Sequence, residues 1–470
     1  MSISRRTVLS TAAALPAVSL LAGAPMASAA TRNTFYISES GNDDAAGTSD
    51  GAPWKTIDRI NKAFADGNIG HGDVIRFKRG ERFYGEFPEL PTPSDASSRL
   101  VFSTYGKGER PQIMGYKVLN KKGAWSKAGT NLWQIYLGDT NNYYGNTSST
   151  EARCGNVGLL RVNNELLGSK KASVDELKND WDFHSDSESK VLTICIPSNP
   201  TSYGDVRIAV DGRLIQTKSY VTIQGLDLIG TGGHGIQVVD STGVKILNNR
   251  IRHIGGSELI GYSVPNTRYG NGVEVWIGSK DVLVASNIIT DVYDVATTMQ
   301  GEQTLKPDEW GSPIRLGWSN VHFKSNRITR CSQSFEVWSR GTDFSSESGF
   351  SNCSFTQNNC TDAGVGWGYE ARPNKDEGGV HLLSYAEQLP IDITVTGNRF
   401  VNAVNAYIYR AEKFNTKMSI DENTIQLKAG QRLQAQSGEP GDPQQLETIE
   451  QHVEWSKATG IDANSTFIIE

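Results

Sequence analysis

The chain has 470 residues, of which 37% are hydrophobic and 21% charged, as in globular proteins. Its net charge is −6 and its longest basic runs are pairs, which disfavours nucleic-acid binding because such sites need clustered Lys and Arg. The 48 glycines follow no collagen triplet and indicate many turns.

Residues 1–29 have the features of an export signal. Arg5 and Arg6 precede the apolar stretch "TAAALPAVSLLAGAP", and Ala27-Ser28-Ala29 fits cleavage after small residues. The arginine pair suits either a twin-arginine or an ordinary secretory signal. No later segment approaches the ~18 apolar residues of a membrane-spanning helix. We therefore expect a bacterial protein that is secreted or periplasmic.

Residues 31–117 are expected to form an N-terminal cap and the first coils of a repetitive fold. The spacing of Ile57, Ile60, Ala63 and Phe64 predicts a helix with one apolar face. "DVIRFKRGERFYGEF" and "RLVFSTYGKGERPQIMG" predict strands. Residues 118–204 break this rhythm with hairpin-like strands around a short helix, so we expect a β-rich insertion there.

Residues 205–428 contain a repeat. An asparagine followed two residues later by an apolar side chain recurs at intervals of 38, 39, 32, 40 and 25 residues, at Asn249, Asn287, Asn326, Asn358, Asn398 and Asn423. A short alternating strand precedes each asparagine, so one residue points inward and the next outward. Coils that cannot bury their inward side alone must stack. Asparagine tolerates the left-handed turn conformation, and its amide can bond the next asparagine in the stack. The pattern predicts a parallel β-solenoid; a propeller would need hairpin signals.

The segment from about Tyr220 to Lys428 resembles the right-handed parallel β-helix of the pectate-lyase-like superfamily. "TFYISESGNDDAAGTSDGAPWKTIDRINKAF" resembles the N-terminal opening of its secreted members, where a strand and a helix cap the solenoid. The resemblance implies an all-β fold and a protein related to polysaccharide lyases, glycoside hydrolases or phage depolymerases. Residues 429–470 are polar and then helical, and are expected to cap the C-terminal end.

The five cysteines show no metal-binding spacing, and their odd number leaves at least one unpaired. Packed free thiols are favoured over a disulfide framework.

Two glutamates stand out in matching strands, Glu274 in "GVEVW" and Glu336 in "SFEVW". The repeat places both outward with one coil between them, so their backbones are expected roughly 9–10 Å apart at ~4.8 Å per coil. Inverting glycosidases hold two carboxyl groups ~6.5–9.5 Å apart and retaining ones ~5–5.5 Å apart. We therefore expect an acid and a base; the alternative is a pair of solvated surface glutamates. Asp294 or Glu370 could replace Glu274 as the partner of Glu336.

Two threadings of the coils are possible. The first counts from each asparagine and aligns Glu336 with Thr297, Gly368 and Ile408. The second aligns "GVEVW", "PIRLG", "FEVW" and "GVHLL", and places Arg315 and His381 in the same outward column. The first is favoured because it needs no gap before three strands.

Several further side chains are candidates for substrate binding. Trp276 and Trp338 would face outward, where they suit the apolar faces of sugar rings or pack under long loops. Hydrogen-bond donors and groove-covering residues complete the set: Gln300, Arg340, Arg372, His381, Tyr269, Tyr262 and Arg315. His253 is a second candidate proton carrier, whereas His234, among glycines, is expected in a turn.

Three functions compete. A glycoside hydrolase would use the carboxylate pair on a polysaccharide or oligosaccharide. A polysaccharide lyase would need a base, for which Lys306, Arg315, Tyr269 and His381 are candidates, and Ca²⁺ or Arg against the uronate; no Asp-x-Asp calcium loop occurs, and the acidic chain disfavours a polyanion. A non-catalytic adhesive solenoid would have short, even turns, whereas four consecutive coils here exceed the 25-residue coil by 13, 14, 7 and 15 residues. We expect a hydrolase without a cofactor, and Ca²⁺ only for a lyase.

Overall fold

The computed structural model describes residues 32–147, 153–302, 317–340, 349–373, 375, 378–386, 391–410, 418–436 and 446–470. They belong to one compact unit, Arg32–Glu470. The expected export signal lies outside the described residues. No helix within the described ranges is long and apolar enough to cross a membrane.

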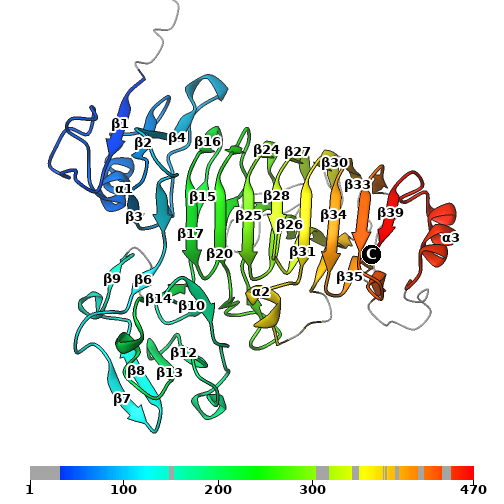
Figure 1. The fold of residues 1–470 in the computed structure, drawn as a ribbon. Coiled ribbons are helices and arrows are strands. Elements are labelled where there is room, and N and C mark those ends of the chain that lie inside the picture. Colours follow the sequence, from blue (N-terminus) through cyan, green and yellow to red (C-terminus); the bar gives the residue numbers. More distant parts are fainter. Residues whose placement is uncertain are drawn as a thin grey trace, which may run out of the picture. The chain divides into compact units, whose positions relative to one another are not determined.

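Three parallel sheets run along the chain, and strands of successive coils lie side by side in each of them (Figure 1). The first sheet contains β1 (Thr34–Ile37), β2 (Val74–Lys78), β4 (Leu100–Tyr105), β16 (Val221–Gln224), β19 (Lys245–Leu247), β24 (Lys280–Ala285), β27 (Trp318–Lys324), β30 (Phe350–Thr356), β33 (Ile391–Thr396) and β36 (Ser419–Asp421).

The second sheet, called the groove sheet below, contains β15 (Arg213–Thr217), β18 (His234–Val238), β23 (Val273–Trp276), β26 (Val295–Glu302), β29 (Gln333–Arg340), β32 (Val380–Ala386), β35 (Ala406–Arg410) and β38 (Arg432–Gln436). The third contains β3 (Arg82–Tyr84), β5 (Gln112–Met114), β17 (Asp227–Thr231), β20 (Arg250–Ile254), β25 (Ile288–Val292), β28 (Arg327–Thr329), β31 (Asn359–Ala363), β34 (Arg399–Ala403), β37 (Thr424–Leu427) and β39 (Thr466–Ile469).

The space enclosed by the three sheets is the hydrophobic core. Alternate strand residues point into it, and rings stack from coil to coil: Phe335 lies 4.5 Å from Phe355, and Trp318 lies 4.4 Å from Phe350, between ring centroids. Each stacked pair buries apolar surface that a single coil would leave exposed, so the coils stabilise one another.

The predicted asparagine ladder is present. In each step the side-chain amide donates to the side-chain oxygen of the next asparagine at 3.0–3.2 Å, and the same oxygen accepts a backbone N–H. The expected left-handed conformation, however, belongs to the residue before each asparagine, with φ between 52° and 66°: Asn248, Ser286, Ser325, Gln357, Gly397 and Glu422. The asparagines themselves turn inward and satisfy buried backbone groups at the bend.

Helices cover both ends of the core. The predicted amphipathic helix is α1 (Ile57–Ala65), whose N-cap Thr56 accepts the Arg59 N–H and whose Ile57, Ile60 and Ala63 are buried. The C-terminal helix α3 (Ile449–Thr459) starts with a capping box between Thr448 and Gln451.

The irregular region after the first coils is an antiparallel lobe, defined here as residues 117–210. One of its sheets contains β6 (Lys117–Val118), β9 (Tyr144–Gly145), β10 (Val157–Val162), β11 (Glu165–Leu167) and β14 (Val206–Val210), and the other β7 (Ser126–Gly129), β8 (Leu132–Tyr136), β12 (Phe183–Asp186) and β13 (Val191–Cys195). The lobe has its own buried apolar cluster. The short helix expected in it is a single 3-10 turn, Val174–Glu176; three other such turns lie at Ala96–Ser98, Thr140–Asn142 and Pro200–Tyr203.

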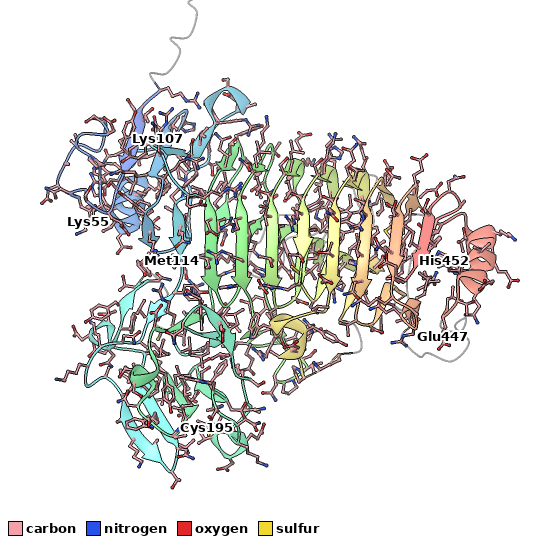
Figure 2. The ribbon with its side chains drawn as sticks, viewed as in Figure 1. Lys55, Lys107, Met114, Cys195, Glu447 and His452 are labelled. Carbon is pink, nitrogen blue, oxygen red and sulfur yellow. The ribbon has the colours of Figure 1, made fainter. Side chains whose placement is uncertain are left out.

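All five cysteines are buried free thiols, as expected. Cys195 lies in the lobe (Figure 2), and burial raises the pKa of Cys353 in the core to about 12.

Candidate active site

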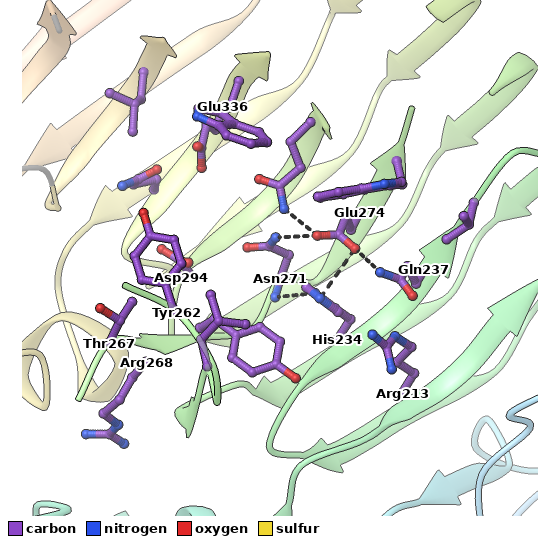
Figure 3. A pocket seen from close by; sticks show the side chains of 18 of the residues that line it. Arg213, His234, Gln237, Tyr262, Thr267, Arg268, Asn271, Glu274, Asp294 and Glu336 are labelled. Carbon is purple, nitrogen blue, oxygen red and sulfur yellow. Dashed lines mark hydrogen bonds and ion pairs between the residues drawn. The ribbon is translucent and has the colours of Figure 1, made fainter. Parts of the chain in front are cut away.

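A groove with a volume of about 910 Å³ runs over the outer face of the groove sheet (Figure 3). Its lining comes from six neighbouring coils and from the loop of residues 255–270, called the groove loop below. The lining residues are Arg213, Gln216, His234, Gln237, Val239, Leu259, Tyr262, Thr267, Arg268, Tyr269, Asn271, Glu274, Trp276, Asp294, Gln300, Glu302, Gln333, Glu336, Trp338, Arg372 and Leu383.

The strand register places Glu274 and Glu336 in one outward column. Glu274 pairs with Thr298, and Thr298 pairs with Glu336. Val275 and Val337, next to the two glutamates, are buried in the core, as alternation requires. The expected separation of two coils is therefore confirmed, and the small side chain of Thr298 stands between the carboxylates.

Glu274 is buried, with 1% of its surface exposed, and it accepts hydrogen bonds from three amides. Gln237 donates to Oε2, and Gln300 and Asn271 donate to Oε1, the Asn271 bond being 3.3 Å long. His234 Nε2 lies 3.3 Å from Oε2 (Figure 3). The burial of this carboxylate is thus compensated by four N–H groups.

Glu336 and Asp294 have different surroundings in the same groove. Glu336 is half-buried and lines the groove two strands from Glu274. Asp294 Oδ1 accepts a 2.8 Å hydrogen bond from Arg372, which also donates to the Tyr293 carbonyl. Asp294 therefore lies within reach of the groove but is held in an ion pair.

Glu370 lies apart from the other carboxylates. It ends the short helix α2 (Trp367–Glu370), is exposed, and does not line the groove. Its neighbour Arg372 does line the groove, through the contact with Asp294.

Trp276 and Trp338 both line the groove, as their outward alternation predicts. Gln300 pairs with both in the register, and the two ring centroids are 6.3 Å apart at an angle of 34°. The rings are half-buried, so each keeps an accessible face or edge next to the carboxylates.

The groove loop forms one wall of the groove. Its short hairpin pairs β21 (Ser257–Glu258) with β22 (Arg268–Tyr269), and the lobe holds it in place. Ser257 Oγ donates to the Asn156 carbonyl and Arg268 donates to the Gly158 carbonyl, both at 2.9 Å. Tyr269 donates its hydroxyl hydrogen to Asp211, and burial raises the pKa of Tyr269 above its ordinary value.

The structure corrects both threadings. In the coil after Asn287 the residue aligned with Glu336 is Thr298, one position from the expected Thr297. In the coil after Asn358 it is Leu383, because α2 and a loop intervene where the first threading placed Gly368. In the next coil Tyr409 follows Leu383, so Ile408 faces the core.

His381 was expected in the outward column of the second threading, and this is wrong. It is fully buried, its Nδ1 lies 2.9 Å from Ser334 Oγ, and its ring contacts Phe400 at 5.3 Å. His253 is also buried and bonds the Tyr116 hydroxyl outside the groove lining. Lys306, Arg315 and the side chain of Arg340 lie outside the described residues.

Sequence reasoning missed three of the residues that contact Glu274: His234, Gln237 and Asn271. His234 begins strand β18 rather than lying in a turn. A signal for Gln237 existed, because "GIQV" at residues 235–238 has the same pattern as "GVEV" at residues 272–275 and stands one coil before it. No signal connected His234 or Asn271 with Glu274. Among the described residues, no group of three or more His, Cys, Asp or Glu is arranged to hold a metal ion.

Residues 207–425 match the family model described as "Right handed beta helix region". Together with the three parallel sheets, this match shows that this part of the chain forms a right-handed parallel β-helix. The expectation of a right-handed parallel β-helix is thereby confirmed. A curated relative, the lacto-N-biosidase of Bifidobacterium longum subsp. longum, is 28% identical over 159 residues. The match covers 33% of this chain and 9% of that protein, so this chain spans only about a tenth of the relative's length.

Three solved structures are also similar. The complex of XylC with xylose has a TM-score of 0.47 at 12% identity, with 93% of this chain and 82% of that chain covered. A structure titled glycoside hydrolase has a TM-score of 0.48 at 10% identity, with 92% and 99% covered. The GH136 lacto-N-biosidase from Eubacterium ramulus has a TM-score of 0.43 at 11% identity, with 93% and 68% covered.

Proposed function

We propose that this chain is a secreted or periplasmic glycoside hydrolase that acts on a polysaccharide or oligosaccharide. The observation that carries the proposal is the pair of carboxylates, Glu274 and Glu336, in one outward column of the groove sheet and in one groove. Two carboxyl groups flanking a glycosidic bond are the minimum that most glycosidases need.

The surroundings of the two glutamates suit different roles. Among the described residues, the partners of Glu274 are N–H donors, so both its oxygens act as acceptors, which suits the base that activates a water. Glu336, half-buried on the groove wall, suits the acid that protonates the leaving oxygen. Two coils place the backbones roughly 9.6 Å apart, with Thr298 on the strand between them. Carboxyl groups held at ~6.5–9.5 Å leave room for a water.

The aromatic pair supports a sugar substrate. Trp276 and Trp338 present apolar surface directly beside the carboxylates, where the C–H face of a sugar ring can pack. The match to a lacto-N-biosidase, whose name denotes a glycosidase, supports the same class of reaction, although it covers only a third of this chain.

The described charges of the groove favour hydrolysis over β-elimination. Four carboxylates line it, Glu274, Asp294, Glu302 and Glu336, and these would repel a uronate. Three arginines line the groove. Arg372 pairs with Asp294 and Arg268 donates to three backbone carbonyls; Arg213 is the third, so the four carboxylates still outnumber the arginines. Tyr269 donates to Asp211 and its raised pKa disfavours a phenolate base.

The test is an assay of the purified chain against neutral and acidic glycans with two readouts. Reducing ends report any cleavage, and the absorbance of an unsaturated uronate reports elimination. We expect new reducing ends from a neutral glycan without that absorbance. Reducing ends together with the absorbance would show a lyase instead, and binding without any cleavage would show a non-catalytic solenoid.

A further inference from the structure

His234 is packed where backbones approach closely. It begins β18 between Gly233 and Gly235, and a Cβ at these glycines would lie 2.1 Å from the Gly212 oxygen and 2.6 Å from the Gly272 oxygen. Larger residues would push β18 away from the neighbouring coils. The glycines therefore bring the backbone of Asn271 within hydrogen-bond distance of the imidazole.

The hydrogen bonds of His234 determine which nitrogen carries its proton. The backbone N–H of Asn271 donates to Nδ1 at 3.1 Å, so Nδ1 must be an acceptor. In the neutral ring the proton is then on Nε2, which lies 3.3 Å from Glu274 Oε2 (Figure 3). The backbone N–H of Asn271 cannot rotate as a side-chain donor can, so the fold itself selects the tautomer with the proton on Nε2.

The remaining neighbours fix the ring and keep it neutral. Tyr269 packs its ring against His234 at 5.1 Å and 66°, and its hydroxyl is held by Asp211. Four charged groups act on the imidazole: Glu274, Asp211, Asp294 and Arg213. The burial of His234 outweighs the three carboxylates and lowers its pKa from 6.5.

We propose that His234 is a positioning residue for Glu274: its Nε2–H, fixed by Asn271, orients the carboxylate toward the groove. The proposal rests on the proposed function, because Glu274 is taken there as the base. The three amide side chains that donate to Glu274 are flexible and can move with the carboxylate when it rotates. The imidazole of His234 is held by the Asn271 backbone and by the Tyr269 ring, so it keeps the carboxylate in one orientation. His234 itself exchanges no proton with substrate.

Two substitutions of His234 distinguish the effect of its N–H donor from the effect of its ring. His234→Gln keeps an N–H donor near the position of Nε2, whereas His234→Leu removes it. We expect His234→Leu to lose ~10–100-fold in kcat/KM, mostly in kcat, as for loss of a hydrogen bond to a charged group, and His234→Gln to stay within about 3-fold of wild type.

A spectroscopic experiment tests the proposal without any substrate. The whole chain is labelled with 15N-histidine, and its imidazole 15N shifts are followed between pH 5 and 8; the signals of His234 are those missing in His234→Gln. We expect a neutral Nε2–H ring throughout, with an Nε2 shift that changes in Glu274→Gln. His253→Gln, which removes a buried histidine outside the groove, is the control.

Each outcome decides the proposal. An Nδ1–H tautomer, titration of His234 near pH 6.5, or an unchanged Nε2 shift in Glu274→Gln would overturn it, whether or not the chain cleaves a glycan. If the 15N shifts match the expected Nε2–H ring and no glycan is cleaved, the proposed function is wrong but the hydrogen bond from His234 to Glu274 is supported. If the chain is active and His234→Gln falls as far as His234→Leu, the positioning role is wrong.

Discussion

Glu274 and Glu336 stand in one column of the groove sheet, separated by a single strand that contributes Thr298. Their surroundings differ: Glu274 is buried among four N–H groups, and Glu336 is half-buried on the groove wall. The strand register thus places two carboxylates with different surroundings in one groove. Different surroundings are what allow one carboxylate to act as an acid and the other as a base.

The separation of the pair predicts the stereochemistry of cleavage. Two coils of about 4.8 Å leave space for a water between base and sugar, so the product should have the inverted anomeric configuration. Proton NMR of the first product, recorded before mutarotation, checks this. A product with the retained configuration would point to a closer pair, with Asp294 as the partner to examine.

The tryptophan pair should contribute to substrate binding rather than to the chemical step. We expect Trp338→Ala to raise KM about 3–10-fold, which corresponds to about 0.5–1.5 kcal/mol for an aromatic contact, with a smaller change in kcat. Trp338→Phe should recover most of the affinity. Steady-state kinetics on one substrate measure both, and an unchanged KM in Trp338→Ala would place the sugar elsewhere.

The asparagine ladder should contribute measurably to the stability of the solenoid. Asn326 makes two side-chain donations, to Val284 and Asn358, and its oxygen accepts from both the backbone and the side chain of Asn287. Asn326→Ala leaves these buried groups unpaired and should cost about 3 kcal/mol of unfolding free energy or more, at 1–3 kcal/mol per group. Asn359→Ala, at an exposed position of β31, should cost under about 0.5 kcal/mol in the same denaturant titration.

His381 predicts a loss of stability in acid. Burial lowers its pKa to about 4, below the 6.5 of an exposed histidine, so the unfolded chain binds more protons between these values. The unfolding free energy therefore falls as the pH decreases from 7, by about 2 kcal/mol at pH 5 from this residue alone.

The contribution of His381 is measured by comparison with His381→Gln, whose stability should fall less between pH 7 and 5. Glu86 acts in the opposite direction in both proteins, because burial raises its pKa to about 7. Its contribution is present below pH 4.5 and is lost as the pH rises through 7. Equal pH dependence in both proteins would show that His381 does not remain neutral in the folded state.

The parts of the fold set by local repetition could be predicted from the sequence. The six asparagines and the twin motifs around Glu274 and Glu336 recur at fixed places, because each coil repeats the same bend. The left-handed residue was misplaced by one position, since several residue types, from Ser286 to Gln357, adopt that conformation there.

Predictions failed where contacts join residues that are far apart in the sequence. His381 appears in an alternating strand like Glu274, yet its Ser334 partner comes from another coil and lets it turn inward. The helix α2 interrupts the coil after Asn358, so the residue aligned with Glu336 is Leu383. A count at the fixed spacing of the repeat cannot predict this shift. The four donors around Glu274 come from Gln237, Asn271, Gln300 and His234, on three coils, and only the folded chain brings them together.

The central claim is that Glu274 and Glu336 carry out the cleavage. Its most direct test is the kcat/KM of Glu274→Gln and Glu336→Gln on one cleaved glycan, with Glu370→Gln, exposed and outside the groove, as the matched control. We predict losses of about 10²–10⁴-fold for each groove variant, as for removal of a general acid or base, and wild-type activity for the control. Wild-type activity in either groove variant would contradict the claim.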